Sequence, residues 1–182
     1  IAGEREANII YANHIEEKLA ANMSYLYIDV GGGSTELSVF VNQKLAASKS
    51  FNIGTIRILD NQDKEETWSE MKGWIKTNTA GLKNLAGIGT GGNINKLFRM
   101  SGAKEDSTLS VVKLEEMYNE LNGYSLKDRI SKLKLNHDRA DVIVPACTIY
   151  LAMMKWSGVK QMYVPKVGMV DGIINLLIEE NL

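Results

Sequence analysis

Two kinds of hydrophobic pattern alternate along the chain, and each change of pattern marks the boundary of a predicted element. Period-two alternation and short apolar runs predict strands over 24–30, 34–42, 44–52, 82–88 and 158–164, with a weak strand at 108–112. Helical spacing predicts helices over 1–22, 64–81, 94–100 and 168–180, and a short helix that ends near residue 59. The order is therefore a three-stranded meander followed by alternating helices and strands.

Residues 111–155 are helical in pattern throughout, and we interpret them as a helical insert. The last predicted helix of this stretch, 137–155, contains Pro145. A proline inside a helix removes a backbone hydrogen bond, so we expect a kink or a helix start nearer to Pro145. Cys147 lies on the apolar stripe of this helix and is expected to be an inert core thiol.

A meander followed by βα units predicts an α/β fold with a mixed sheet flanked by helices. We assign residues 1–182 to a single domain of the ribonuclease H-like type, which is one half of an actin-type fold. The length of 182 residues suits one such domain.

Composition excludes some classes of function but does not identify one. The formal net charge of -1 offers no bulk attraction to nucleic acid or to an anionic membrane. No apolar run reaches the roughly 18 residues of a membrane span, and the first residues do not resemble a signal peptide. A single cysteine excludes an internal disulfide and fits a reducing compartment. We expect a cytoplasmic protein with neither a nucleic acid nor a membrane as partner.

The most informative stretch is a glycine turn between the first two predicted strands. Gly31, Gly32 and Gly33 are consecutive, and the hydroxyl residues Ser34 and Thr35 follow them. Three glycines leave the backbone N–H groups bare, which can form a nest for an anion. Acids flank the turn at positions 29 and 36, and carboxylates beside a phosphate are suited to a divalent cation. The alternative is an ordinary glycine turn between solvated acids.

A second glycine turn joins a predicted strand to a predicted helix. Gly87, Gly89 and Gly92 satisfy G-x-G-x-x-G, and a helix N-terminus after a strand is a favourable place for phosphate. A dinucleotide-binding motif would need a second parallel strand that ends in an acid about 20 residues later. That strand is weak here, and three strands precede the motif instead of following it, so we favour a simple phosphate turn.

Two other groups invite chemistry but have simpler explanations. Glu4 and Glu6 lie near the start of the first predicted helix, where acids stabilise the helix dipole. His137 and Asp138 could bind a metal, but no second pair of this kind exists and His14 is the only other histidine.

Several segments together resemble one family. Ile28-Asp-Val-Gly-Gly-Gly-Ser-Thr-Glu-Leu37 is similar to the second-domain phosphate signature of the exopolyphosphatase / guanosine pentaphosphate phosphatase (Ppx/GppA) family, which belongs to the actin-like ATPase superfamily. The other similar segments occur in the family's order at 1–10, 51–57, 89–93, 139–145 and 167–174. The chain departs from the family pattern at Asn8, where arginine is frequent, and at Ala146, where glycine is usual.

The resemblance implies Mg²⁺-assisted hydrolysis of a terminal phosphoanhydride in inorganic polyphosphate or guanosine pentaphosphate. It implies catalytic roles for Glu6 and Glu36 and metal binding by Asp29 and Glu36. The phosphate-binding residues that it implies are Gly31, Gly32, Gly33, Ser34, Thr35, Gly89, Thr90, Gly91, Gly92 and Asn93.

The resemblance also implies a partner domain. The family's first domain carries a strand that ends in Asp-x-Gly-Ser-Asn-Ser, and this chain contains no such sequence. We therefore expect the chain to be the second half of a longer, two-domain protein and to be nearly inactive alone. Open alternatives are an ATP-binding half-domain of the same superfamily and a non-catalytic domain that binds phosphate-rich ligands. A homodimer also stays open.

Overall fold

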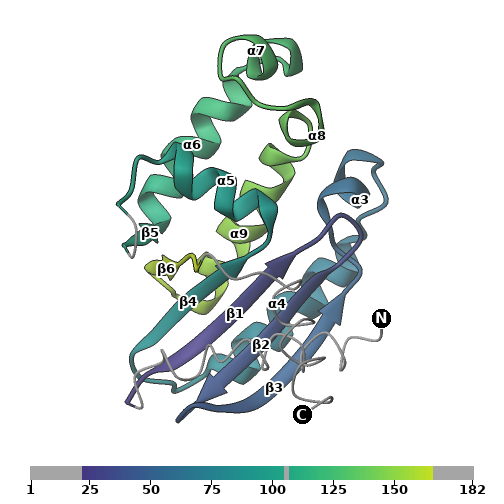
Figure 1. Ribbon diagram of the computed structural model, residues 1–182. Helices are drawn as coiled ribbons and strands as arrows, with labels where there is room; N and C mark the ends of the chain where they lie inside the picture. Colours follow the sequence, from purple (N-terminus) through teal and green to yellow (C-terminus); the bar gives the residue numbers. More distant parts are fainter. Residues whose placement is uncertain (1–21, 105–106, 166–182) are drawn as a thin grey trace, which may run out of the picture.

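The fold is built on one six-stranded mixed sheet (Figure 1). The computed structural model describes residues 22–104 and 107–165. The strands are β1 (Ser24–Val30), β2 (Thr35–Val41), β3 (Lys44–Phe51), β4 (Leu85–Thr90), β5 (Thr108–Ser110) and β6 (Gln161–Tyr163). The predicted helices over 1–22 and 168–180, and with them Glu6, lie outside the described residues.

The order across the sheet is β3-β2-β1-β4-β6-β5. Strands β1, β2 and β3 form the predicted antiparallel meander, and Asn42 and Gln43 turn between β2 and β3 with φ of 50° and 62°. Strand β4 pairs in parallel with β1 and with β6, while β5 closes the edge antiparallel to β6. This mixed sheet confirms the predicted fold class.

Helices alternate with the later strands as the sequence pattern predicted. They are α3 (Thr55–Leu59), α4 (Glu65–Thr79), α5 (Gly92–Met100), α6 (Val111–Gly123), α7 (Leu126–Ser131), α8 (His137–Ala140) and α9 (Ile143–Ser157). Among the described elements, α9 contacts α3, α4, α5, α6 and strand β1. The expected insert at 111–155 is thus helical, but its last helix is part of the domain core.

The main core lies between one face of the sheet and these helices. Alternate residues of β1 point into it, namely Leu26, Ile28 and Val30, and they pack with buried residues of α4 and α9. The other residues of β1 face the opposite side, where Tyr27 joins a smaller apolar cluster with Phe40 and Ile88. This alternation is the physical basis of the period-two pattern in the sequence.

Cys147 is buried in the main core, and burial raises the pKa of its thiol to about 12. The thiol therefore stays protonated near neutral pH, which agrees with the predicted inert core residue.

Two predicted boundaries were wrong. The strand expected over 82–88 is β4, Leu85–Thr90, because Gly81 and Asn84 hold positive φ angles of 73° and 52° in the preceding turn. The strand then continues through Gly89, for which the glycine pattern predicts a turn. A Cβ at Gly89 would lie 2.4 Å from the Met162 sulfur, so glycine at this position allows β6 to pack closely against β4.

The helix expected over 137–155 is divided into α8 and α9. Pro145 is the third residue of α9, in the first turn, where a backbone N–H has no partner within the helix. Between the two helices the Asp141 carboxylate accepts a hydrogen bond of 2.8 Å from the Val142 N–H. The alternative of a start near Pro145 is therefore confirmed.

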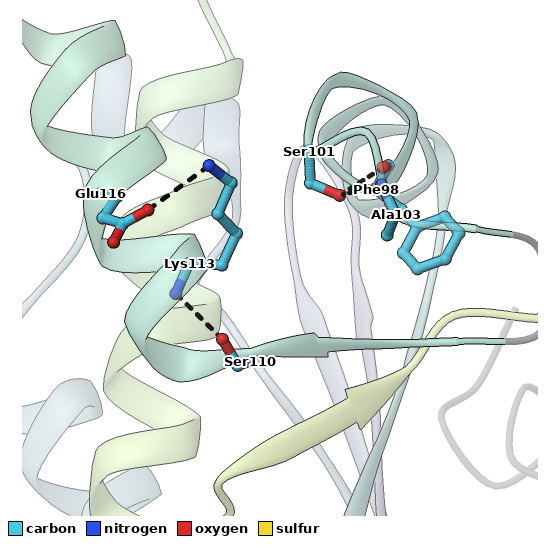
Figure 2. Close-up of polar contacts among 6 residues, drawn as sticks. All are labelled: Phe98, Ser101, Ala103, Ser110, Lys113 and Glu116. Atoms are coloured by element: carbon cyan, nitrogen blue, oxygen red, sulfur yellow. Dashed lines mark hydrogen bonds and ion pairs between the residues drawn. The ribbon is translucent and has the colours of Figure 1, made fainter.

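Local hydrogen bonds fix where α5 ends and α6 begins (Figure 2). After α5, the Ser101 hydroxyl donates to the Phe98 carbonyl at 2.7 Å and accepts from the Ala103 N–H. At the start of α6, the Ser110 hydroxyl accepts from the Lys113 N–H at 3.1 Å, which is an ordinary N-cap. These serine contacts end one helix and start the next on either side of the short strand β5.

The glycine turn between β1 and β2 rests on the start of α3. The carbonyl oxygens of Gly31 and Gly32 accept from the N–H groups of Thr55 and Ile56 at 3.0 Å and 2.9 Å. The Arg57 Nε donates to the Gly33 carbonyl at 2.6 Å. Three successive carbonyls of the turn are therefore fixed by one short helix, which orients the turn.

This contact requires glycine at position 54. A Cβ there would lie 2.4 Å from the Gly32 carbonyl oxygen and 2.7 Å from the Gly33 carbonyl carbon. Both neighbours are backbone atoms that cannot rotate away, so residue 54 sets how closely α3 approaches the turn.

We expect Gly54→Ala to destabilise the protein by about 1–3 kcal/mol, the usual cost of inserting a methyl group into a packed site. Chemical denaturation would measure this free energy of unfolding. Gly73→Ala is the matched control, because a Cβ at Gly73 in α4 meets nothing within 4 Å and alanine favours a helix by up to about 1 kcal/mol. Equal stability of Gly54→Ala and the wild type would contradict the proposed close packing.

Candidate functional site

Both glycine turns begin at the same end of the sheet, where strands β1 and β4 terminate. Strands β1 and β4 are parallel neighbours, and their pairing ends at Asp29 and Thr90. Parallel strands present their carboxyl ends together, and ligands of open α/β sheets bind in that position. The turns that follow β1 and β4 therefore face one shared cleft.

The cleft has a volume of about 380 Å³. The residues that line it are Asp29, Val30, Gly31, Gly32, Thr55, Ile56, Gly91, Gly92, Asn93, Asp138, Arg139 and Val142. Six residues predicted from the sequence as site residues are among them: Asp29, Gly31, Gly32, Gly91, Gly92 and Asn93. The structure thus brings together two segments that are about 60 positions apart in the chain.

The first turn exposes part of its backbone to ligands. The Gly31 N–H is already used, because it donates to the Ser34 carbonyl at 2.9 Å within the hairpin. In the described part of the chain, the N–H groups of Gly32 and Gly33 donate to no backbone carbonyl. These two donors are therefore the ones that the turn can offer to an anion.

The second turn is the N-terminus of α5. Gly91 is the N-cap of this helix and has a φ of +102°, a backbone conformation that residues other than glycine rarely adopt. The first N–H groups of a helix have no partner within it, and here they belong to Gly92, Asn93 and Ile94. A helix start beside a glycine turn is a favourable place for phosphate oxygens.

Asp29 supplies a carboxylate to the same cleft. Its side chain is 6% exposed, and a Cβ at Gly91 would lie 3.0 Å from the Asp29 Oδ1 atom. This carboxylate suits Mg²⁺, which is usually held by one or two carboxylates while phosphate oxygens and water complete its shell. Within residues 22–104 and 107–165, no three His, Cys, Asp or Glu residues come together as a metal cage.

Glu36 lies opposite Asp29 in the β1–β2 ladder, so both side chains are on the same face of the sheet. Its carboxylate accepts hydrogen bonds from Ser34 at 2.6 Å and Ser50 at 2.9 Å, and it is not part of the cleft lining. The Ser34 hydroxyl therefore donates to Glu36, not to the cleft.

Three further predicted residues have structural partners. Thr35 is fully buried and its hydroxyl donates to the Ile53 carbonyl at 2.7 Å. Gly89 and Thr90 belong to β4 and pair with Ile28 and Asp29 of β1. These residues hold the strand ends in place beneath the turns.

Arg139 is a functional candidate that the sequence pattern does not single out. Its Nη1 donates to the Asn93 Oδ1 at 3.1 Å, and its Nη2 would be 2.6 Å from a Cβ at Gly92. The guanidinium therefore lies against the N-terminus of α5 and adds a positive charge to the cleft. The signal was present in the Arg139-Ala-Asp segment, but only the fold shows that α8 reaches the glycine turns.

The fold bears on the dinucleotide-binding motif and on the His137–Asp138 pair. Strand β5, after α5, pairs antiparallel with β6 at the sheet edge, so the parallel strand that a dinucleotide motif requires does not follow α5. Asp138, set aside as a metal ligand, lies in the cleft lining 3.7 Å from the Arg139 guanidinium. Asp138 forms an ion pair with Arg139 there, and the sequence did not predict its position in the cleft.

None of the helices in the described ranges is long and apolar enough to cross a membrane.

Comparison with known proteins gives consistent matches. The model of the Ppx/GppA phosphatase family matches residues 1–180. A guanosine-5'-triphosphate,3'-diphosphate pyrophosphatase of Aeromonas hydrophila is 25% identical over 194 residues, which cover 100% of this chain and 39% of that protein. The chain thus spans about two-fifths of this curated relative.

Solved structures match in fold. The Ppx/GppA family member of Aquifex aeolicus has a TM-score of 0.76 at 18% identity, and the match covers 100% of this chain and 64% of that one. An exopolyphosphatase of Cytophaga hutchinsonii has a TM-score of 0.74 at 20% identity, with coverage of 99% and 65%.

The sheet order, the two glycine turns at one edge and the match of the family model over nearly all residues agree with one another. This chain belongs to the Ppx/GppA phosphatase family, in the actin-like ATPase superfamily.

Proposed function

We propose that this chain is the phosphate-binding half of a phosphoanhydride hydrolase that releases terminal phosphate from inorganic polyphosphate or guanosine pentaphosphate. One observation carries this proposal: two glycine turns, a buried carboxylate and a guanidinium meet in a single cleft. The names of the relatives, a pyrophosphatase and an exopolyphosphatase, support the reaction class.

In this proposal the terminal phosphate is bound mainly by backbone. The free N–H group of Gly32 approaches it from one side, and those of Gly92 and Asn93 approach it from the other. The Arg139 guanidinium adds charge-assisted hydrogen bonds, which are about twice as strong as neutral ones. Phosphoryl transfer depends mostly on position and charge neutralisation, and these groups supply both.

Asp29 is the residue that would hold a Mg²⁺ ion, together with oxygens of the substrate. When bound, the ion would neutralise charge on the phosphate oxygens. Glu36 would contribute by keeping Ser34, and with it the first turn, in a fixed position.

Glu6 is proposed as the general base. Water forms a new O–P bond to the terminal phosphorus, its proton passes to the Glu6 carboxylate, and the bond from phosphorus to the bridging oxygen breaks. The electron pair of that bond leaves with the shortened phosphate chain. Glu6 lies outside the described residues, so sequence resemblance alone supports this role.

We further propose that a first domain of the same protein closes the cleft. The relatives are longer than this chain, which covers 39% and 64% of their lengths in two comparisons. Actin-type folds bind their ligand between two such domains, and half of a cleft leaves a phosphate exposed to water.

We expect Glu6→Gln in the full-length protein to lower phosphate release by about 100-fold or more, the usual contribution of a general base. The assay uses polyphosphate, guanosine pentaphosphate and ATP in turn, each with Mg²⁺. Glu4→Gln, an equal loss of charge on the same predicted helix, is the control and should retain activity.

Each outcome of this assay has a defined meaning. Unchanged release in Glu6→Gln would refute the assignment of the base. Release from ATP alone would favour the ATP-binding alternative, and no release from any of the three substrates would favour a binding domain without catalysis.

We expect Arg139→Gln to raise the KM for the same substrates about tenfold or more, because a charged hydrogen bond contributes about 1.5–3 kcal/mol. Arg99→Gln on the exposed side of α5 removes the same charge away from the cleft and is the control. Equal effects of the two variants would show that general charge, and not contact in the cleft, explains the change.

We expect the 182-residue chain alone to release phosphate far more slowly than the full-length protein under the same conditions, because the second wall of the cleft is missing. Circular dichroism would verify that the chain is folded. Robust release by the folded chain alone would contradict the two-domain proposal.

A further inference from the structure

A buried tyrosine on α9 lies close to the carboxyl ends of strands β1 and β4. Tyr150, on α9, is 0% exposed, and its hydroxyl donates to the Thr90 carbonyl at 2.5 Å. Thr90 is the last residue of β4 and immediately precedes the turn at Gly91.

The same hydroxyl also meets the end of β1. Val30, the last residue of β1, lies next to the same phenol. A Cβ at Gly91 would lie 3.9 Å from the Tyr150 hydroxyl and 3.4 Å from the Val30 carbonyl oxygen. One phenol oxygen is therefore close to the points at which both glycine turns begin.

The pairing of β1 with β4 ends at Asp29 and Thr90. Beyond that point the ladder no longer holds the strands together, and the turns at 31–34 and 91–92 depart separately. A contact that bridges the two strand ends there can fix the distance between the turns, which the ladder cannot do.

We propose that Tyr150 is a positioning residue that holds the two glycine turns at the spacing required to bind one phosphate between them. This inference rests on the proposed function for its catalytic consequence, but its structural part can be tested independently. Tyr150 does not line the cleft.

The environment of the phenol keeps it a donor. Burial, reinforced by the nearby Asp29 carboxylate, raises the pKa of Tyr150 well above its usual value. The hydroxyl therefore keeps its proton, and its bond to the Thr90 carbonyl is maintained across the ordinary pH range.

A second buried tyrosine provides a matched control. Tyr27, in β1, is 1% exposed, and its hydroxyl lies near the Thr90 side chain on the other face of the sheet. Tyr27→Phe and Tyr150→Phe each remove one buried phenol oxygen near the ends of β1 and β4, but only Tyr150→Phe removes a hydrogen bond to the backbone carbonyl of Thr90.

The test compares both variants in the full-length protein by amide hydrogen exchange and by steady-state kinetics. For Tyr150→Phe we expect faster exchange in the two turns, residues 31–34 and 91–94, with exchange in α6 unchanged. We expect its kcat to fall by about tenfold to a hundredfold with a smaller change in KM, since misplacement of about 1 Å has effects of this size. Tyr27→Phe should stay within about twofold of the wild type in both measurements.

Three results would overturn the inference. They are unchanged exchange in both turns of Tyr150→Phe, an equal effect of Tyr27→Phe on the turns, or faster exchange that extends equally to α6, which would indicate general destabilisation. Wild-type protein that releases no phosphate would refute the proposed function instead, and the exchange of the two turns would then decide the role of Tyr150.

Discussion

The candidate site depends on the parallel pairing of β1 with β4. These strands are separated in the chain by two other strands and two helices, yet their carboxyl ends are adjacent in the sheet. Each end continues into a glycine turn, and the pairing therefore converts two weak local motifs into one concave surface. An isolated glycine turn could bind an anion only loosely, whereas two turns that face each other can surround it.

A set of contacts from other elements keeps the turns in position. The start of α3 fixes the carbonyl groups of the first turn, and the close approach at Gly54 makes that contact tight. Helix α9 places Tyr150 at the end of β4, where its hydroxyl donates to the Thr90 carbonyl. The position of the two turns therefore depends on helices that lie elsewhere in the sequence. This is the arrangement expected when binding uses backbone N–H groups, because a backbone donor can be aimed only by moving the chain.

The cleft contains the guanidinium of Arg139 and the carboxylates of Asp29 and Asp138. A carboxylate alone would repel a phosphate, and a guanidinium alone would bind it without a place for a cation. Both groups line the same cleft, and Arg139 is fixed to Asn93 at the start of α5. Glu36, although paired with Asp29 in the ladder, is bound by two serine hydroxyls. The two acids that flank the glycine run in the sequence thus have different surroundings in the fold.

The sequence by itself determined the order of elements, the mixed sheet and the first glycine turn. Period-two and helical patterns report which residues face the core, and consecutive glycines predict a turn because glycine adopts backbone conformations that other residues avoid. It could not decide where β4 ends, because Gly89 looks like a turn residue until Met162 is known to lie against it. Only the tertiary structure decided that Thr35 and Glu36 turn to internal partners and that Arg139 and Asp138 join the cleft. Those assignments depend on contacts between residues distant in the chain, for which local patterns carry no information.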